Sequence, residues 1–407
     1  MDSVDQYLAD IAAAVRPLPA RELALADAYG AVLAGDVTAQ WPLPAFDNSA
    51  MDGYAVLARD VAGASAGTPV TLPVDGEIAA GDTSSRELTP GTCIRIMTGA
   101  AMPGGADAVV PVELTDGDTE RVTVREAVSA GASVRRRGGD AVPGDLLLPA
   151  GSRIGPVQLG LLATAGLGRV QARPRPRVTV ISTGDELIEP GQPLEPGQIW
   201  ESNSIMLAAA ARQAGCDATR YPVVRDDTGA VLAAVQDALT QADLLVTSGG
   251  VSMGAEHDVV KAALSKLGTV GFRQVAMQPG MPQGFGMVGD DTPIFTLPGN
   301  PVSAYVSFWL FVNPAIAALQ NLHPKQMGTS TAALTAAARS PLNKRSFLRG
   351  ILDRQTGQVT PVSGQASHQL ASLAKANALI VVPETVTALA AGDQVHVLEL
   401  PALGVEL

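Results

Sequence analysis

The sequence is poor in aromatic side chains, cysteine and histidine. Aromatic residues supply only 4% of its 407 residues, so its cores have to be built from aliphatic side chains. The two cysteines, Cys93 and Cys216, lie far apart and form no Cys-x-x-Cys pair, which argues against a disulfide framework and against a zinc site. Of the four histidines, His257 and His368 could bind a metal or act as bases, but neither has a partner histidine beside it.

Positive charge is scarce as well, because 28 basic residues face 40 acidic ones and the net charge is −12. A surface of this sign repels phosphate backbones, which argues against nucleic-acid binding. The first ten residues carry acidic side chains and no apolar segment, so we expect no signal peptide. The longest apolar run, near Ala304–Val312, is interrupted by Ser307 and is too short to span a bilayer. We therefore expect a cytoplasmic protein without a membrane segment.

The composition is that of a folded protein with several cores. Hydrophobic residues make up 46% of the chain and charged residues 17%, which excludes a largely disordered protein. The length predicts about two to four domains. The 42 glycines and 29 prolines are scattered along the chain, as in β structure divided by tight turns.

The character of the sequence changes twice along the chain. An amphipathic helix begins near the N-terminus with a capping box of Ser3 and Gln6. From residue 32 to about 148, and again from 330 onward, short β-rich segments are separated by glycines. Between 177 and 322, strands alternate with helices, which indicates a parallel sheet covered on both faces. The expected fold class is multidomain α/β plus β, with a central parallel-sheet α/β domain flanked by β-rich domains and a helical, extended N-terminal segment.

The middle part is expected to form a binding crevice at the carboxyl ends of its strands, where ligands collect in open α/β sheets. The expected strands are 177–182, one that closes at 223–224, 244–247 and 294–297, and the expected helices are 204–214, 227–240, 258–267 and one from Pro301. The segments that follow the strand ends are Ser182–Glu186, Arg225–Asp227, Thr247–Gly254 and Pro298–Pro301.

Two of these segments are suited to bind an anion. Asn300 is a favoured helix N-cap and Pro301 a favoured first helical residue, so free N–H groups of this helix would point into the crevice. Taken alone, this turn is better explained as a well-made cap. The segment 248–254 adds glycines whose backbone can approach a phosphate, although it matches neither a Walker A nor a GxGxxG pattern. Two such segments at neighbouring strand ends favour a phosphate or oxyanion ligand.

Carboxylates are expected at the same edge of the sheet. They belong to Asp185, Glu186, Asp226, Asp227 and Asp258, although acidic residues in the first turn of a helix, such as Asp227 and Asp258, are common because they complement the helix dipole. Unpaired carboxylates would repel an anion, and Mg²⁺ resolves this conflict because it binds a few carboxylates together with substrate phosphates. The sequence therefore indicates Mg²⁺-assisted chemistry on a phosphorylated substrate.

Two polar segments lie outside the α/β part. Residues 46–55 are turn-rich and have no evident core role, and residues 135–140 contain three consecutive arginines in an acidic protein. Such a charge run is most often a solvated surface. Here it could supply the cations that a substrate dianion needs.

The polar segments together resemble those of a known family. In the order found in the bacterial MoeA family of molybdopterin molybdenumtransferases, the chain contains FDNSAMDGYAV (46–56), IRIMTGAAMPGGADAVV (94–110), RRRGGD (135–140), STGDEL (182–187), SGGVSMG (248–254) and LPGNPVSA (297–304). The C-terminal domain of gephyrin and the N-terminal domain of the plant counterpart are similar. The resemblance runs from the N-terminal helix to the end of the chain, and no single motif carries it.

The resemblance implies a domain organisation and an activity. Four subdomains are expected: an elongated one from residues 1–45 and 141–176, an inserted β-rich one from 46–140, a molybdopterin-binding-like α/β domain from 177–324 and a β-barrel-like one from 325–407. An elongated homodimer with a shared cleft is implied. The implied reaction is the Mg²⁺-dependent insertion of molybdate into adenylylated molybdopterin with release of AMP, the last step of molybdenum cofactor biosynthesis. Contacts with the adenylyltransferase partner and with molybdoenzyme apoproteins are implied as well.

The positions that match the family's motifs are the candidate site residues. The acidic, catalytic candidates are Asp52, Asp140, Glu186, Asp226 and Asp258, of which Asp226 and Asp258 are the candidate magnesium ligands. The candidate substrate- and anion-binding residues are Thr98, Arg137, Ser248, Gly249, Gly250, Ser252, Pro298, Gly299, Asn300, Pro301, Arg349 and Ser372. Molybdate is the expected substrate, and the sequence does not choose between molybdate and tungstate.

The chain departs from the family at positions that are commonly basic. Gln274, Gln278 and Met281 stand there, and the loss of these cations weakens the attraction for phosphate or molybdate unless Arg273 compensates. Two alternatives to the transferase are open. A molybdopterin adenylyltransferase-like enzyme would resemble residues 177–322 alone, and the flanking β-rich parts argue against it. A non-catalytic cofactor-binding or scaffold protein would be expected to carry a long disordered linker and partner domains, of which the sequence shows none.

Overall fold

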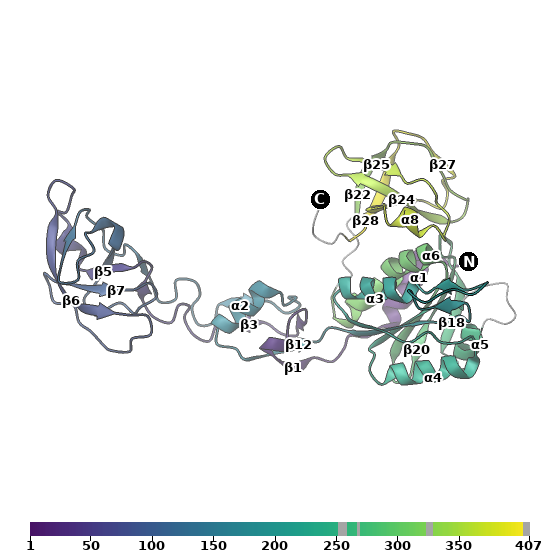
Figure 1. The fold of residues 1–407 in the computed structure, drawn as a ribbon, viewed down its shortest axis with the longest axis horizontal. Coiled ribbons are helices and arrows are strands. Elements are labelled where there is room, and N and C mark those ends of the chain that lie inside the picture. The colour runs from purple at the N-terminus through teal and green to yellow at the C-terminus, as the bar shows by residue number, and fades with distance from the viewer. Residues whose placement is uncertain (251–258, 267–268, 323–328, 402–407) are drawn as a thin grey trace. The chain divides into compact units, whose positions relative to one another are not determined.

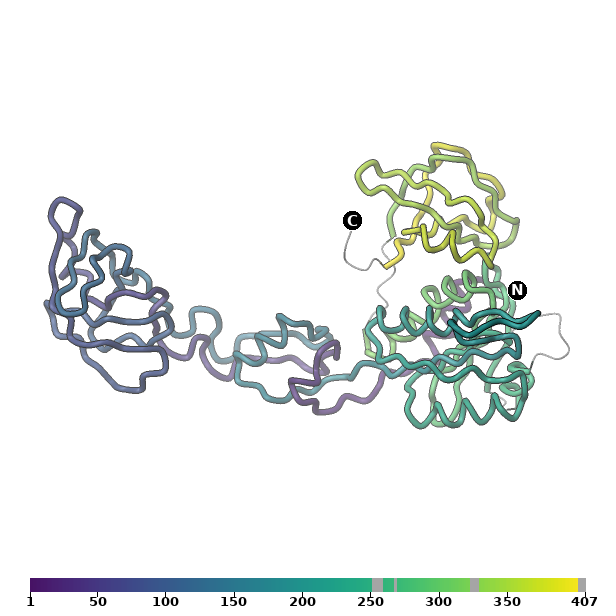
Figure 2. The backbone as a smooth tube through the Cα atoms, in the orientation of Figure 1, coloured from purple at the N-terminus to yellow at the C-terminus, as the bar shows by residue number. Residues whose placement is uncertain are grey.

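The structure, a computed structural model, describes residues 1–250, 259–266, 269–322 and 329–401. The chain folds into two units, and its path can be followed by colour in Figure 2. Unit 1 contains residues 1–23, 30–34 and 171–407, and unit 2 contains residues 24–29 and 35–170. Unit 2 is therefore inserted into the chain of unit 1.

Unit 2 is built around a mixed five-stranded sheet of order β8-β5-β7-β6-β9. Its strands are β5 (Gly53–Val56), β6 (Val70–Ile78), β7 (Cys93–Ile96), β8 (Ala108–Pro111) and β9 (Arg121–Val124). Tyr54 and Val56 face one hydrophobic core, and Ala55 faces another. Because both faces of β5 are covered, this strand is apolar at every position instead of alternating.

Short ladders and one helix complete unit 2. β3 (Val37–Thr38) pairs with β11 (Leu146–Leu148), β4 (Asn48–Ser49) pairs with β10 (Val134–Arg135), and α2 is Pro156–Thr164. A further sheet of β1 (Arg21–Ala24), β12 (Arg169–Arg173) and β2 (Val32–Leu33) lies where the chain passes between the units. The β4–β10 pairing brings the two polar segments near residues 47 and 136 side by side.

The central sheet of unit 1 has the order β16-β13-β17-β21-β20-β18. Its strands are β16 (Asp217–Arg220), β13 (Arg177–Ser182), β17 (Leu244–Ser248), β21 (Thr292–Leu297), β20 (Pro282–Val288) and β18 (Val270–Gln274). The first four are parallel, as expected, whereas β20 and β18 continue the sheet in antiparallel fashion. The expected fold class is confirmed, with this antiparallel edge as an addition.

One expected strand end is wrong. The second strand was expected to close at 223–224, but β16 ends at Arg220, and Val224 makes only an isolated bridge with Thr183. The cause is Pro222, which has no N–H to donate to the ladder and interrupts the pairing.

Helices cover both faces of the central sheet (Figure 1). On one face lie α3 (Asn203–Gln213), α6 (Pro301–Ser307), the π-helical turn η4 (Phe308–Val312), α7 (Asn313–Leu319) and α1 (Val4–Ala14). On the other face lie α4 (Thr228–Leu239) and α5 (Val259–Ser265). Two separate cores therefore hold the sheet between them. The buried residues of the second core are aliphatic, as expected. The first core departs from that expectation, because it gathers the aromatic side chains of Tyr7, Phe295, Phe308, Trp309, Phe311 and Phe347.

The N-terminal helix α1 joins the first of these cores although it is distant in sequence. Its buried side chains include Tyr7, whose ring meets that of Phe311 edge-on, with centroids 4.8 Å apart. At the helix start, the Ser3 hydroxyl accepts the N–H of Gln6, while the Gln6 side chain donates to Asp10. Only half of the expected capping box forms, because the Asp10 carboxylate competes for the Gln6 amide.

The apolar run near 304–312 belongs to a longer helical stretch than expected. Within the described ranges, Pro301–Leu319 is long and apolar enough to cross a membrane by length and composition, with a mean hydropathy of 1.6 over its most apolar window. Of that window, 72% is buried inside the protein. The expectation that this apolar stretch is too short to span a bilayer is therefore wrong. Its burial is that of a core helix.

The C-terminal part of unit 1 is a closed β structure. Its sheet has the order β19-β24-β25-β22-β28-β26, and a further pairing of β24 with β26 closes it. The strands are β19 (Met277–Gln278), β24 (Arg345–Asp353), β25 (Gln358–Pro361), β22 (Thr329–Leu334), β28 (Gln394–Glu399) and β26 (Ala378–Val382). The short helix α8 is Leu370–Leu373, and the β19–β24 ladder joins this part to the segment after β18.

Candidate functional site

The carboxyl ends of three parallel strands lie side by side and carry the two predicted anion-binding loops. Ser182, Ser248 and Leu297 are register partners at the ends of β13, β17 and β21. Gly249 follows with φ +98°, and a Cβ there would stand 3.0 Å from the Thr183 carbonyl oxygen, so only glycine fits without strain. A Cβ on Gly299 would lie 3.7 Å from the Cα of Gly249. The glycine loop and the Pro-Gly-Asn-Pro turn are therefore in contact.

Asn203, the first residue of α3, binds both of these loops. Its Nδ2 donates to the Ser248 hydroxyl over 2.8 Å and to the Gly299 carbonyl over 2.6 Å. The carbonyl oxygen can only accept, which fixes the amide orientation. The Ser248 oxygen consequently accepts from Asn203, and its own O–H remains able to donate to another group.

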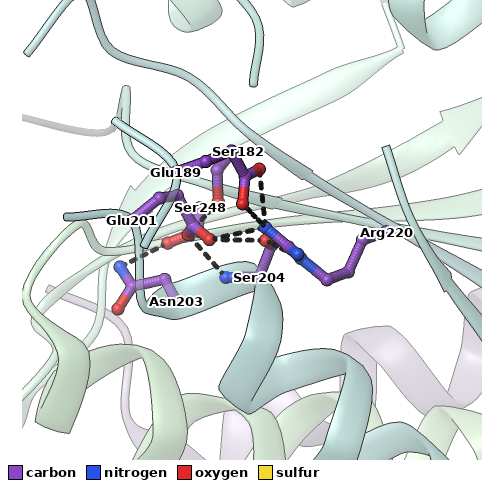
Figure 3. Close-up of polar contacts among 7 residues, drawn as sticks. All are labelled: Ser182, Glu189, Glu201, Asn203, Ser204, Arg220 and Ser248. Carbon is purple, nitrogen blue, oxygen red and sulfur yellow. Dashed lines mark hydrogen bonds and ion pairs between the residues drawn. The ribbon is translucent and has the colours of Figure 1, made fainter. Parts of the chain in front are cut away.

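An ion pair between the buried Glu201 and the partly exposed Arg220 holds the start of α3 against the sheet (Figure 3). Glu201 is 1% exposed and accepts hydrogen bonds from the Ser182 hydroxyl at 2.8 Å and from the backbone N–H and hydroxyl of Ser204, both at 2.7 Å. Its charge is paired with Arg220 at 3.2 Å. Arg220 also pairs with Glu189, which is half exposed. A carboxylate can remain ionised inside a protein when it is satisfied in this way.

The closed β structure contributes a buried arginine near the same turn. Arg349 on β24 is fully buried, and its Nη2 donates to the carbonyl oxygens of Gly364 and Ala366. Within the part of the chain that the structure describes, its Nε and Nη1 have no hydrogen-bond partner, and burial lowers the pKa of this guanidinium. The loop that holds Arg349 continues to Ser367, whose carbonyl accepts the N–H of Val302 at the start of α6.

This contact changes the expectation for the start of α6. One of its first N–H groups, that of Val302, is already bonded to Ser367. Asn300 occupies the N-cap position, but its side chain makes no capping hydrogen bond. Ser372 also lies here, since a Cβ added at Gly364 would be 3.0 Å from its hydroxyl oxygen. The predicted residues from Pro298 to Pro301 thus lie beside the Arg349 loop, with fewer free N–H groups than expected.

Acidic residues follow β13 and the bridge at Val224. The carboxylate of Asp185 accepts the backbone N–H of Asp226 at 3.3 Å, and the carboxylate of Glu186 packs against Gly184. All three acids are exposed. Asp227 instead caps α4 by accepting the N–H of Ala230 at 2.8 Å, so the helix-start explanation suffices for it.

Two candidates, Ser252 and Asp258, lie outside the described residues. Gly250 is described and has φ +74°. Asp52, Thr98, Arg137 and Asp140 lie in unit 2, and all other described candidates lie in unit 1.

Asp52 and Thr98 form a local pair in unit 2. One Asp52 oxygen accepts both the backbone N–H of Thr98 at 2.7 Å and its hydroxyl at 2.8 Å. The backbone hydrogen bond and then the hydroxyl hold the pKa of Asp52 below its usual value. Asp52 is therefore an exposed, ionised carboxylate in a fixed orientation.

The arginine run is partly committed within unit 2. Arg136 pairs with Asp47 at 2.8 Å, and the other Asp47 oxygen accepts the backbone N–H of Arg137 at 2.7 Å. The side chain of Arg137 and the carboxylate of Asp140 are exposed. The run is thus neither a plain solvated stretch nor fully neutralised, and Arg137 can still offer its guanidinium to an anion.

Arg273 cannot replace the basic residues that the chain lacks. It pairs with Asp2 at 3.4 Å and, more closely, with Asp10, both on or beside α1. These acids raise the pKa of Arg273 and use its charge to hold the N-terminal helix. The described part of the chain therefore offers no compensation for Gln274 and Gln278 from this residue.

Sequence reasoning did not single out Glu201, Asn203 or Arg220. Glu201 stands immediately before a helix start, where an acidic residue is ordinarily attributed to the helix dipole. The sequence did contain a signal for Asn203. Ser202 and Asn203 are both residue types that cap helices, and a helix has only one N-cap position, so one of the two was available for another role.

Family models cover most of the chain. They match the "MoeA N-terminal region (domain I and II)" over residues 2–166, a "Probable molybdopterin binding domain" over 179–318 and the "MoeA C-terminal region (domain IV)" over 331–400. Matches on both sides of the middle domain argue against the adenylyltransferase-like alternative.

Curated relatives match over nearly the full length. A protein of Mycobacterium tuberculosis named "Molybdopterin molybdenumtransferase 2" is 47% identical over 98% of this chain and 100% of its own length. One of Bacillus subtilis named "Molybdopterin molybdenumtransferase" is 39% identical over 92% of this chain and 89% of its own. Among solved structures, a MoeA protein of Pyrococcus horikosii covers 98% of this chain and 99% of its own, with a TM-score of 0.76 and 31% identity.

The fold and the family matches define a multidomain protein whose middle α/β domain is of the probable molybdopterin binding type. Sequence and structure agree on a transferase. The chain belongs to the MoeA family, whose curated members are named molybdopterin molybdenumtransferase.

Proposed function

We propose that the enzyme transfers molybdenum from molybdate to molybdopterin, that it uses the adenylylated form of molybdopterin, and that AMP is released with Mg²⁺ present. The observation that carries the proposal is Arg349. A fully buried guanidinium whose Nε and Nη1 find no hydrogen-bond partner among the described residues is costly, and an oxyanion would satisfy both nitrogens and the charge.

The acids at the strand ends support magnesium. Among the described residues, no group of three or more histidine, cysteine or acidic side chains gathers as a dedicated metal site. Mg²⁺ does not need one, because it keeps several waters and takes one or two carboxylates together with substrate phosphates. Asp226, with Asp185 beside it, suits that role, and Asp258 is the proposed second ligand. The bound ion would polarise the phosphate group.

The residues at the strand ends act as positioning and binding groups. The Ser248 hydroxyl offers a donor at the end of β17, while Arg349 and Ser372 belong to the C-terminal β structure, whose Ser367 is bonded to the start of α6. Asp52, Asp140, Thr98 and Arg137 are proposed to serve the same reaction from unit 2. Preoriented donors and cations stabilise charge that develops during transfer.

The test is a defined assay with purified protein, adenylylated molybdopterin, molybdate and Mg²⁺. We expect AMP release together with formation of active cofactor, and both should stop when EDTA removes the metal. An active relative, assayed in parallel, controls for the substrates. If the relative releases AMP and this protein does not, the proposed reaction is wrong.

The proposal extends to the assembly and its setting. We propose a homodimer of the 41.6 kDa chain in the cytoplasm, in contact with the adenylyltransferase and with molybdoenzyme apoproteins. Light scattering coupled to size exclusion measures the mass directly. A single 41.6 kDa species at micromolar concentration would contradict the dimer.

A further inference from the structure

We propose that Asn203 is a positioning residue at the strand ends, which makes the Ser248 hydroxyl a hydrogen-bond donor for the oxyanion, and that the pair of the buried Glu201 with Arg220 holds Asn203 in place. The inference rests on the proposed function of these strand ends, and its positioning residues, Asn203, Glu201 and Arg220, lie outside the candidate motifs.

The hydrogen bonds of Asn203 have a defined direction. Gly299 offers only a carbonyl, so the Asn203 amide must turn its N–H groups toward Gly299 and Ser248. Ser248 is 2% exposed, and its oxygen is engaged as an acceptor. The hydrogen bonds of the described residues include no acceptor for the Ser248 O–H. A hydroxyl whose oxygen already accepts a bond is also a stronger donor, because hydrogen bonds in a chain polarise one another.

Asn203 also connects the loops that follow β17 and β21. Asn203 is bonded to the loop after β17 and to the turn after β21, so its side chain sets the separation of the two predicted anion-binding segments. The same turn leads into α6, whose second residue is bonded to the loop that holds Arg349. A continuous set of hydrogen bonds therefore joins Ser248 to the neighbourhood of the buried guanidinium.

Asn203 is held in place by its neighbours along the chain. Glu201 lies two residues before it and accepts hydrogen bonds from Ser182 at the end of β13, from Ser204 on the other side of Asn203, and from Arg220. Figure 3 shows these groups converging with Arg220 at the start of α3. Asn203 thus stands between two residues that are tied to the sheet, which leaves its side chain little freedom.

Two substitutions at one position separate this role from simple packing. Asn203→Ala removes the two N–H donors, and Asn203→Asp keeps the shape but replaces them with a carboxylate. That carboxylate would draw the Ser248 O–H toward itself and would repel an anion. We expect the kcat/KM for molybdate to fall about tenfold in Asn203→Ala and about a hundredfold in Asn203→Asp. A packing role predicts the reverse order, because aspartate preserves the volume.

The link to Glu201 is tested by a double-mutant cycle. Glu201→Gln alone is expected to lower kcat/KM about fivefold, and on the Asn203→Ala background it should lower it less than about twofold further. The matched control is Asp243→Asn. It breaks the Arg177–Asp243 pair at the opposite ends of the same strands, β13 and β17, and should leave kcat/KM within about twofold of wild type.

The dissociation constant of molybdate, measured by calorimetry, repeats the comparison without turnover. Wild-type protein that binds molybdate but does not turn over would refute the proposed reaction alone, and the order of the dissociation constants would still decide this inference. Equal values for wild type, Asn203→Ala and Asn203→Asp would overturn it, as would fully additive effects in the cycle. If Glu201→Gln does not fold, the order of the two Asn203 variants decides by itself.

Discussion

Replacement of Arg349 by methionine tests whether a buried cation is retained for a ligand. Arg349→Met removes two hydrogen bonds, to Gly364 and Ala366, each contributing about 1 kcal/mol. It also removes two buried nitrogens, Nε and Nη1, that have no hydrogen-bond partner among the described residues and cost about 1–3 kcal/mol each. These effects oppose one another. We therefore expect the free energy of unfolding without ligand to stay within about 2 kcal/mol of wild type.

Molybdate should distinguish the two proteins. At 100 times its dissociation constant, a ligand that binds only the folded state adds about 2.7 kcal/mol to the free energy of unfolding. We expect this gain in the wild-type protein and its absence in Arg349→Met, measured by urea denaturation with and without molybdate. Arg354→Met, at an exposed arginine paired with Glu399, is the control and should keep the gain.

Two results would refute this reasoning. An equal gain from molybdate in wild type and Arg349→Met would show that the guanidinium does not meet the anion. A loss above about 4 kcal/mol without ligand would show that Arg349 behaves as one half of a satisfied buried pair, whose disruption costs about 3–5 kcal/mol. In that case the residue would be structural.

Three further predictions follow from the same geometry. Asp226→Asn should lower turnover and raise the Mg²⁺ concentration needed for half-maximal rate, with little change in unfolding, and unchanged rates would refute its metal role. Thr98→Val should raise the pKa of Asp52 in part, as measured by carbon NMR, because it removes the hydroxyl but keeps the backbone N–H, the larger cause of the lowered pKa. Because the folded pKa of Asp52 is lowered, its stabilising contribution is present above about pH 4 and is lost as the pH falls through the lowered value, and an unmoved pKa would contradict the role of the hydroxyl. Glu201→Gln should lower the free energy of unfolding by about 2–4 kcal/mol, measured by urea denaturation. Glu189→Gln, at the exposed partner of the same arginine, should lower it by less than about 1 kcal/mol. Equal losses would contradict the importance of burial at Glu201.

The strand ends of the central sheet were predictable because each strand is a short apolar run that stops at a polar or glycine-rich segment. Periodicity reports such local patterns well. It failed at Val224, where the apolar run continues past Pro222 although the ladder does not. It also missed the antiparallel edge, because β18 and β20 are interrupted by glycines at positions where a Cβ would meet a neighbouring strand.

The environment of the site could not be predicted in the same way. Glu201 is buried only because Arg220, on the neighbouring strand, and Ser182, at the end of another, converge on it. Arg349 lies in a strand whose sequence gives no sign of full burial, and the loop that encloses it comes 15 residues later. Burial of a charge depends on partners that are distant in sequence, and no local pattern encodes them.

The position of α1 in the core of unit 1 has a consequence during synthesis. Its apolar face, including Tyr7, is completed by Phe311, which the ribosome adds roughly 15–60 s later at ordinary elongation rates of about 5–20 residues per second. Unit 2 is made entirely within that interval. The apolar face of α1 therefore stays uncovered until its partner segment emerges, and hydrophobic surface exposed in this way is prone to aggregate during synthesis.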